Sequence, residues 1–288
     1  MVLSVGADGR FAGLVVPELI RRGASVRGLV HKPKNAREAR NNGASEVVIG
    51  DLRDPATLDE ALKGVSRIFY IAPVFAPDEA QLGLNLIAAA RQAGVRRVVF
   101  SSVIHPTLEL ENHSAKIPVE AALHNSGMEF VVLQPATFFQ NFDAAWPAIL
   151  KTGVLAEPFS KTARIARVDF RDVAEVAALA LLEDRLVFGT FELCADGMPN
   201  REDIARIMSD VLDRNIQAAE PTFEEWAAKV RPPHDQMQPL KKMYEFYGAQ
   251  GAPGNSLTLR AILGRTPRTL RNYIEELAGQ DSLRLGAA

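Results

Sequence analysis

Cysteine is almost absent from this sequence, because the 288 residues include only Cys194. A single cysteine excludes an intrachain disulfide and with it the class of small disulfide-stabilised secreted domains. An excess of either charge is also lacking, since 33 Lys and Arg face 35 Asp and Glu. Without a basic field the chain is not expected to bind nucleic acid.

Long apolar runs are missing as well. The best stretch, residues 177–182, lies between Glu175 and Glu183 and is far shorter than the roughly 18 residues that a membrane-spanning helix needs. The first residues carry no basic lead of the kind that opens a signal peptide. These absences predict a cytoplasmic protein with no membrane partner.

The first half of the chain alternates short β-branched runs with longer amphipathic stretches, which is typical of repeated βα units. The composition is that of a globular protein, with 47% apolar and 24% charged residues. We therefore expect an α/β fold with a doubly wound parallel sheet. The predicted strands are 2–5, 25–30, 46–49, 67–72, 97–101 and 129–134, and the predicted helices are 14–22, 35–42, 55–62, 79–93 and 118–125.

The pattern loosens after about residue 153. Helices are predicted over 171–182, 200–212 and 223–230, with Asn200 as the N-cap of the second, and a late strand over 190–193. We therefore predict a dinucleotide-binding Rossmann domain over 1–153. Residues 154–288 form the second part, and whether some of its elements return to the first sheet stays open.

A glycine-rich turn joins the first predicted strand to the first predicted helix. Gly6 permits a tight turn, Gly9 lets the backbone approach a pyrophosphate, and a small Ala12-Gly13 pair lets the helix pack close to the sheet. The N-terminus of the helix favours an anion there. The sequence thus predicts a dinucleotide site, with a merely structural turn as the alternative; the turn residues assigned to the cofactor are Gly6, Asp8, Gly9, Arg10 and Phe11.

The end of the second strand predicts which dinucleotide binds. An NAD enzyme usually offers an acidic residue about 20 positions after the glycine turn, for the ribose hydroxyl. Here the segment between Glu18 and Glu38 carries only basic charges. His31 and Lys32, with Arg10 from the turn, suit a 2′-phosphate, so NADPH is expected in preference to NADH. The alternative is a solvated basic loop.

Other residues follow strands at the carboxyl edge of the sheet, where ligands of open α/β sheets bind. Asp51 and Leu52 follow the third strand and could meet the adenine, although Asp51 could equally cap the helix that starts at Pro55. The walls of the nicotinamide ribose site are predicted from the fourth and fifth strands, namely Ile71, Ala72, Pro73 and Ser101.

Several short motifs together resemble the NmrA-like group of atypical short-chain dehydrogenases, which includes quinone oxidoreductases, triphenylmethane reductases, isoflavone-reductase-like enzymes and redox-sensing regulators. The resemblance covers the whole chain and is strongest over residues 1–142. It implies a Rossmann domain, a smaller α+β C-terminal substrate domain and a substrate cleft between them. The motifs are Gly6-Ala7-Asp8-Gly9, Gly50-Asp51-Leu52, Ser101-Ser102-Val103, His113-Ser114-Ala115-Lys116 with Glu120 and Leu123, Gln134-Pro135-Ala136 with Phe138 and Asn141, and Leu263-Gly264-Arg265-Thr266-Pro267.

Two positions depart from the family pattern. Asp8 stands where the family usually has Thr or Ser, and its carboxylate should repel a pyrophosphate unless it caps the helix and turns away. Asn112 stands four residues before Lys116, where ordinary short-chain dehydrogenases carry a catalytic Tyr. The usual Tyr acid is therefore missing.

The resemblance assigns the remaining chemistry to Lys116, as a ligand of the nicotinamide ribose and a proton shuttle, and it adds Pro135 to the cofactor set. His113 is a second candidate proton donor. A surface lysine and a loop histidine bonded to backbone are the alternatives. The histidines lack metal-ligand spacing, so no metal is predicted.

Aromatic residues follow the last clear strand and recur near the C-terminus. Such a set suits a flat apolar substrate, with core packing as the alternative for each residue. The predicted substrate residues are Phe138, Phe139, Trp146, Tyr244 and Tyr247.

These features predict an NADPH-dependent reductase that transfers hydride to a small aromatic carbonyl, quinone or conjugated acceptor. A homodimer is compatible with this interpretation. The alternative function is that of a non-catalytic NADP(H)-binding redox sensor that regulates a partner protein.

Overall fold

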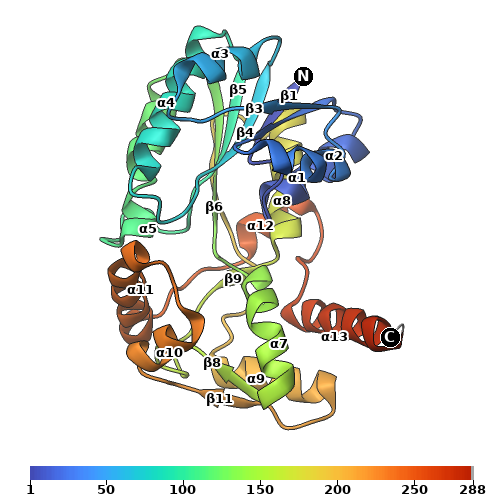
Figure 1. Ribbon diagram of the computed structural model, residues 1–288, viewed down its shortest axis with the longest axis vertical. Helices are drawn as coiled ribbons and strands as arrows, with labels where there is room; N and C mark the ends of the chain where they lie inside the picture. The colour runs from blue at the N-terminus through green and yellow to red at the C-terminus, as the bar shows by residue number, and fades with distance from the viewer. Residues whose placement is uncertain (287–288) are drawn as a thin grey trace. The chain divides into compact units, whose positions relative to one another are not determined.

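The computed structural model describes residues 1–286. These residues form two compact units, each built from separate stretches of chain (Figure 1). The first unit comprises Met1–Pro135 and Phe170–Glu192, and the second comprises Ala136–Asp169 and Leu193 onward.

A seven-stranded sheet forms the centre of the first unit, in the order β10-β6-β5-β4-β1-β2-β3. The pairs among β1 to β6 are parallel, which confirms the predicted doubly wound Rossmann sheet. The order reverses between β1 and β4, the kind of switch point at which such sheets bind ligands. The strands are β1 Val2–Val5, β2 Val26–Val30, β3 Glu46–Ile49, β4 Arg67–Ile71, β5 Arg97–Ser101, β6 Glu129–Pro135 and β10 Thr190–Leu193.

Helices cover both faces of this sheet (Figure 1). On one face Leu58, Leu86 and Leu123 pack into one core with apolar residues of β1, β4, β5 and β6. On the other face α1 packs against α8. The helices of the unit are α1 Ala12–Arg21, α2 Ala36–Asn41, α3 Pro55–Leu62, α4 Glu79–Gln92, α5 Glu111–Ser114, α6 Ile117–His124 and α8 Phe170–Leu182, with a 3₁₀ turn, η1, at Pro33–Asn35.

Arg97 fastens the C-terminus of α8 to the start of β5. Its guanidinium is fully buried and donates to the carbonyls of Ala180 at 3.0 Å and Glu183 at 2.6 Å. It also pairs with the carboxylates of Glu129 and Asp184. A helix C-terminus leaves its last carbonyls without partners, and here a single cation satisfies them.

The second unit has two small parallel sheets and six helices among the described residues. Strand β7 (Thr137–Phe138) pairs with β9 (Arg167–Val168), and β8 (Val154–Ala156) pairs with β11 (Gln217–Ala219). Its core contains Phe142, Ile204 and Ile274. The helices are α7 Phe142–Thr152, α9 Arg201–Leu212, α10 Phe223–Val230, α11 Met237–Gln250, α12 Leu257–Leu263 and α13 Leu270–Gly286, with 3₁₀ turns η2 at Phe139–Asn141 and η3 at His234–Gln236.

The division of the chain differs from the predicted boundary at residue 153. The first unit stops at Pro135, because the chain leaves the sheet at the end of β6 and builds β7 and α7 into the other core. It resumes at Phe170, so α8 and β10 return to the first sheet, the arrangement that the sequence left open.

Candidate functional site

The glycine-rich turn after β1 is held by its own backbone. Gly6 has a φ of +70°, a conformation that favours glycine, and its N–H donates to Leu29 O at 2.8 Å. The N–H of Gly9 donates to Gly6 O at 2.7 Å, and a Cβ added at Gly9 would lie 3.0 Å from that same oxygen. A side chain at position 9 would therefore crowd the backbone of the turn.

Close packing continues at the start of α1. A Cβ at Gly13 would come within 2.7 Å of Asn42 Nδ2, an atom that donates to Ala7 O at 3.0 Å. The first turn of α1 holds no acidic residue, and its N-cap residue is Phe11. No acidic side chain of the first turn therefore neutralises the positive end of the helix.

Asp8 is directed away from the start of α1. Its carboxylate accepts a hydrogen bond from Asn35 Nδ2 at 2.5 Å, across the turn η1 that follows β2. It does not cap the helix. The side-chain amide of Asn35, which the sequence analysis missed, accounts for an acidic residue in a phosphate-type turn.

Arg10 and Phe11 lie beside α8. The Phe11 ring contacts the Phe170 ring with centroids 4.9 Å apart, and the Arg10 guanidinium lies 5.4 Å from the centre of the Phe11 ring. Both side chains are therefore placed by an aromatic contact with a helix that the chain reaches only after residue 169.

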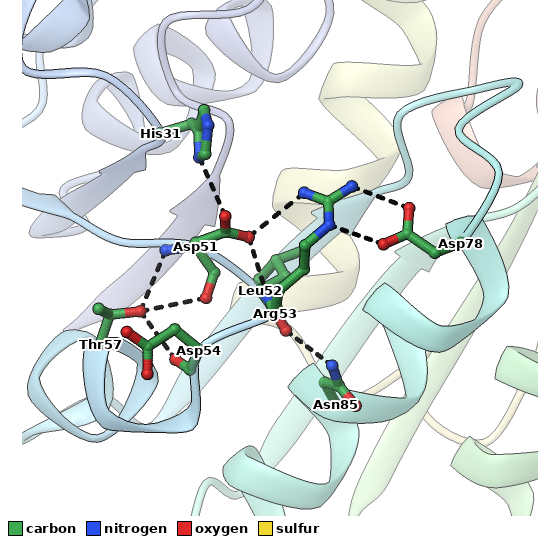
Figure 2. A network of polar contacts seen from close by, with 8 residues as sticks. All are labelled: His31, Asp51, Leu52, Arg53, Asp54, Thr57, Asp78 and Asn85. Atoms are coloured by element: carbon green, nitrogen blue, oxygen red, sulfur yellow. Dashed lines mark hydrogen bonds and ion pairs between the residues drawn. The ribbon is translucent and has the colours of Figure 1, made fainter.

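The loops after β2 and β3 meet in one polar network (Figure 2). His31 Nδ1 lies 3.7 Å from Asp51 Oδ2. The Asp51 carboxylate also accepts from the backbone N–H of Arg53 at 2.9 Å, and Arg53 makes a two-pronged pair with Asp78 at 2.7 and 2.8 Å. Lys32 is exposed beside this network. His31 and Asp51 thus lie together where the loops after β2 and β3 meet.

The capping alternative for Asp51 is wrong, because the N-cap of α3 is Asp54, which accepts from the N–H of Ala56 at 3.0 Å. Asp51 N instead donates to Thr57 Oγ1 at 3.0 Å, and Leu52 O accepts from Asn85 Nδ2 at 2.9 Å. These bonds fix the loop after β3 between α3 and α4.

Serine hydroxyls line the ends of β1 and β5. Among the described residues, the buried Oγ atoms of Ser4 and Ser101 have no hydrogen-bond partner. The next serine, Ser102, donates to Glu120, whose carboxylate also accepts from Gln134 Nε2 at 3.1 and 3.2 Å. The Ser101 hydroxyl is thus a buried polar group without a hydrogen-bond partner among the described residues.

Lys116 is buried in an ion pair rather than lying at the surface. Its side chain is 6% exposed and pairs with the carboxylate of Glu79, which is 3% exposed and starts α4. The other oxygen of Glu79 accepts from the N–H of Phe75 at 3.0 Å, and Lys116 Nζ also donates to Asn112 O at 3.2 Å. Burial raises the pKa of Glu79, while the ammonium opposes that rise. The surface-lysine alternative is therefore wrong.

Glu79 carried no sequence signal beyond its position at the start of a predicted helix. A glutamate there is ordinarily a solvated partner of the helix dipole. Its burial depends on Phe75, whose φ of +62° turns the loop after β4 back over the carboxylate.

His113 is 1% exposed, and its Nδ1 lies 3.1 Å from the carbonyl of His105. A carbonyl only accepts, so this nitrogen carries a hydrogen. Burial lowers the pKa of His113 below its usual value of 6.5. The ring is therefore bonded to backbone in a buried position that favours its neutral form.

The predicted substrate aromatics all belong to the second unit. Phe139 and Trp146 lie in its core, where Phe139 contacts Tyr273 at a ring distance of 5.8 Å. Tyr247 is also buried. Phe138 and Tyr244 are half-buried, and the Tyr244 ring packs against Phe159 and Trp226.

Within residues 1–286, no helix is both long and apolar enough to cross a membrane. The same part of the chain holds no group of three or more His, Cys, Asp or Glu residues that could bind a metal ion.

Comparison with known proteins identifies relatives over the whole length. NAD(P)H azoreductase from Xenophilus azovorans is 27% identical over 278 residues, which cover 95% of this chain and 96% of that protein. Quinone oxidoreductase 2 of Escherichia coli is 28% identical over 201 residues, or 68% of this chain and 69% of the relative.

Solved structures share the fold. The NADPH complex of the Escherichia coli NADPH-dependent quinone oxidoreductase aligns with a TM-score of 0.85 and 24% identity, covering 96% of this chain and 99% of the other. Triphenylmethane reductase from Citrobacter aligns with the same TM-score at 20% identity and the same coverage. The sequence pattern of the NmrA-like family matches residues 1–285. The chain therefore belongs to the NmrA-like family.

Proposed function

We propose that the protein is an NADPH-dependent reductase that transfers hydride to a small aromatic carbonyl, quinone or conjugated acceptor. The turn after β1 carries the proposal, because a Cβ at Gly9 would crowd the carbonyl of Gly6 and α1 begins without an acidic residue. Such a turn suits a pyrophosphate. The names of the azoreductase and quinone oxidoreductase relatives support the choice of acceptor.

Different residues around this turn would bind different parts of the cofactor. Gly6, Gly9 and the start of α1 would bind the pyrophosphate, with Asp8 kept aside by Asn35. His31 and Lys32, with Arg10, would bind the 2′-phosphate. The remaining predicted contacts are Phe11, Asp51, Leu52, Ile71, Ala72, Pro73, Ser101 and Pro135.

NADPH supplies the hydride when it is bound. Lys116 would hold a proton at Nζ and donate hydrogen bonds to the nicotinamide ribose, with Glu79 fixing the direction of its side chain. His113 is the second candidate donor, and its neutral ring would donate through a nitrogen.

One observation favours the redox-sensor alternative. Lys116 already has its charge neutralised by Glu79, and Asn112 stands where ordinary short-chain dehydrogenases carry their Tyr acid. A sensor requires only that the cofactor binds. An enzyme also requires that NADPH is consumed when an acceptor is present.

The test combines cofactor titration with turnover. NADPH and NADH are titrated calorimetrically into the wild type, Lys32→Ala and the matched exposed control Lys34→Ala. We expect Lys32→Ala to weaken NADPH binding about 10-fold and leave NADH binding unchanged, because a charge-assisted bond to phosphate is lost.

NADPH oxidation is then followed with quinones, azo dyes and triphenylmethane dyes. Oxidation with at least one acceptor is the expected result. Tight NADPH binding without any oxidation would favour the sensor, and equal affinity for both cofactors would contradict the assignment of the basic loop.

A further inference from the structure

The second unit buries two arginines that share a single nearby carboxylate, that of Glu157. Arg167 lies on β9 with 4% exposure, and Arg201 starts α9 with 2% exposure. Arginine is almost never fully buried unless it is paired, because the desolvation of an ion costs several kcal/mol. The partners of these two guanidinium groups therefore need to be identified.

Arg201 is only partly satisfied. Its Nη1 donates to the carbonyls of Phe159 at 2.9 Å and Ala219 at 3.0 Å, and its Nε donates to Glu157 Oε2 at 3.3 Å. Its buried Nη2 has no hydrogen-bond partner within the described part of the chain.

Arg167 shares the same acceptor at longer range. Its Nη2 lies 3.8 Å from Glu157 Oε2, and its buried Nε makes no hydrogen bond to any described residue. One oxygen of one carboxylate thus serves two guanidinium groups. Glu157 is itself 26% exposed, so solvent reaches the shared carboxylate, whereas the side chains of Arg167 and Arg201 are only 5% and 1% exposed.

A second carboxylate acts on Arg201 only through its charge. Glu220 is exposed and accepts from the backbone N–H of Lys161 at 2.8 Å. It does not satisfy either unpartnered N–H. Among the described residues, Glu157 is thus the carboxylate that lies within ion-pair distance of both guanidinium groups.

Each arginine lies over one aromatic ring. The Arg201 guanidinium lies 4.3 Å from the centre of the Phe159 ring, and the Arg167 guanidinium lies 5.0 Å from that of Phe142. The Tyr244 ring stacks near Phe159 with an interplanar angle of 11° and a centroid distance of 5.7 Å. Thr137 is the β7 partner of Arg167, which brings Phe138 to the next position of the same ladder.

We propose that Arg167 and Arg201 form an oxyanion subsite that binds the carboxylate or sulfonate of an aromatic acceptor, with Glu157 as the counter-ion that the ligand displaces. This inference rests on the proposed reductase function and narrows its substrate class. The acidic group of such a ligand would accept hydrogen bonds from the unpartnered N–H groups of the arginines. Its planar ring would pack near the half-buried aromatic residues Phe138 and Tyr244. Guanidinium groups bind such oxyanions by paired, charge-assisted hydrogen bonds.

Displacement of Glu157 by the ligand predicts that removing the Glu157 charge tightens binding of an oxyanion. An ordinary structural ion pair predicts no such gain. If the arginines serve only to hold Glu157, then Glu157→Gln removes a stabilising charge and gains nothing. If they await an external oxyanion, the same change removes a competitor and leaves a neutral side chain of similar shape.

The experiment measures binding of naphthoquinone-2-sulfonate and of its neutral parent naphthoquinone by protein fluorescence, without NADPH. We expect the wild type to bind the sulfonate more tightly than the parent. Glu157→Gln should tighten sulfonate binding about 10-fold and change parent binding less than about 2-fold. Arg167→Met should remove the preference, whereas the exposed control Arg206→Met should keep it.

Thermal unfolding of each variant shows whether it is folded. If Arg167→Met does not fold, the sulfonate affinity of Glu157→Gln alone tests the subsite. Unchanged or weaker sulfonate binding in Glu157→Gln would overturn the subsite. NADPH oxidation with the two quinones is recorded separately. If neither is reduced while Glu157→Gln still tightens sulfonate binding, the reductase proposal fails and the subsite stands.

Discussion

The role of Lys116 depends on Glu79, because a buried ammonium is stable only while its partner carboxylate remains. The single change Lys116→Ala therefore does two things: it removes the predicted proton donor, and it leaves a buried Glu79 without its cation. A clean measurement must separate chemistry from the cost of that orphaned carboxylate.

The variant Lys116→Ala/Glu79→Gln removes both charges together. At saturating NADPH we expect its turnover to fall about 100-fold, the contribution typical of a positioned proton donor, with a much smaller change in NADPH affinity. Turnover is measured by NADPH oxidation and affinity by calorimetry. Glu79→Gln alone is the control, and wild-type turnover in the double variant would show that Lys116 takes no part in the chemistry.

His113 gives the fold a pH dependence of known sign. Its pKa is lower in the folded protein than in the unfolded chain, so the unfolded state binds more protons and stability falls as the pH drops below about 6.5. The slope contributed by one such group is at most about 1.4 kcal/mol per pH unit.

Replacing His113 with Asn should therefore reduce the loss of unfolding free energy between pH 7 and pH 5.5, by about 1 kcal/mol. Urea unfolding at the two pH values measures it, and exposed His234→Asn should keep the wild-type difference. An equal loss in His113→Asn and the wild type would contradict the assignment of a neutral buried ring.

The sequence predicted the positions of residues well where a residue type has a single structural role, as glycine has in a tight turn. The spacing of Gly6, Gly9 and Gly13 predicted a turn that the backbone geometry reproduces. It failed where a partner lies far away in the sequence, as for Asn35 with Asp8 and Glu79 with Lys116. Gly28 was a missed signal, since a glycine inside a strand indicates close approach, and a Cβ there would lie 2.8 Å from Ala7 Cβ.

At the scale of whole elements, the βα alternation was readable because each helix predicted up to residue 125 is followed within a few residues by a glycine, and the strands are short runs rich in apolar residues. The helix over Arg201–Leu212 was also confirmed, since Asn200 and Asp203 form a capping box. Strands β7 and β9 have two residues each, too few to carry a period. Helix α7 contains Pro147, which argues against a helix when the sequence is read alone.

The attachment of α8 to the sheet offers an element-scale prediction. Arg97→Met should destabilise the protein by about 1–3 kcal/mol, because the last carbonyls of α8 lose their buried donor, while Glu129 and Asp184 keep their pairs with Arg96. Arg96→Met is the matched control, since Arg96 pairs with the same Glu129 at a half-exposed position. Exposed pairs contribute at most about 1 kcal/mol. Urea midpoints compare the two, and equal midpoints would contradict the role of Arg97.

At the scale of the molecule, the first unit is complete only with Phe170–Glu192, a segment that follows the first stretch of the second unit, Ala136–Asp169. A chain ending at residue 153 would lack α8, whose partner α1 would then expose an apolar face. We expect this fragment to aggregate or to unfold without a cooperative transition. Residues 1–135 joined by a short Gly/Ser linker to 170–192 should fold cooperatively and bind NADPH.

Circular dichroism with urea titration tests both chains. A cooperative transition for the fragment 1–153 would mean that the sequence-based boundary already encloses a complete unit. Sequence patterns could not have revealed the true division, because an interrupted sheet and a continuous one have the same local periodicities.

The chain crosses between the two units three times, after Pro135, Asp169 and Glu192. During synthesis neither unit is complete when its first segment leaves the ribosome. The first unit still needs Phe170–Glu192, and the second still needs the residues from Leu193 onward. Genetic exchange is constrained in the same way, since no single crossover can swap one unit as a cassette. New acceptor preferences in such a lineage are therefore expected to arise by point substitution at positions such as Glu157 and Arg167, within a second unit that stays with its original first unit.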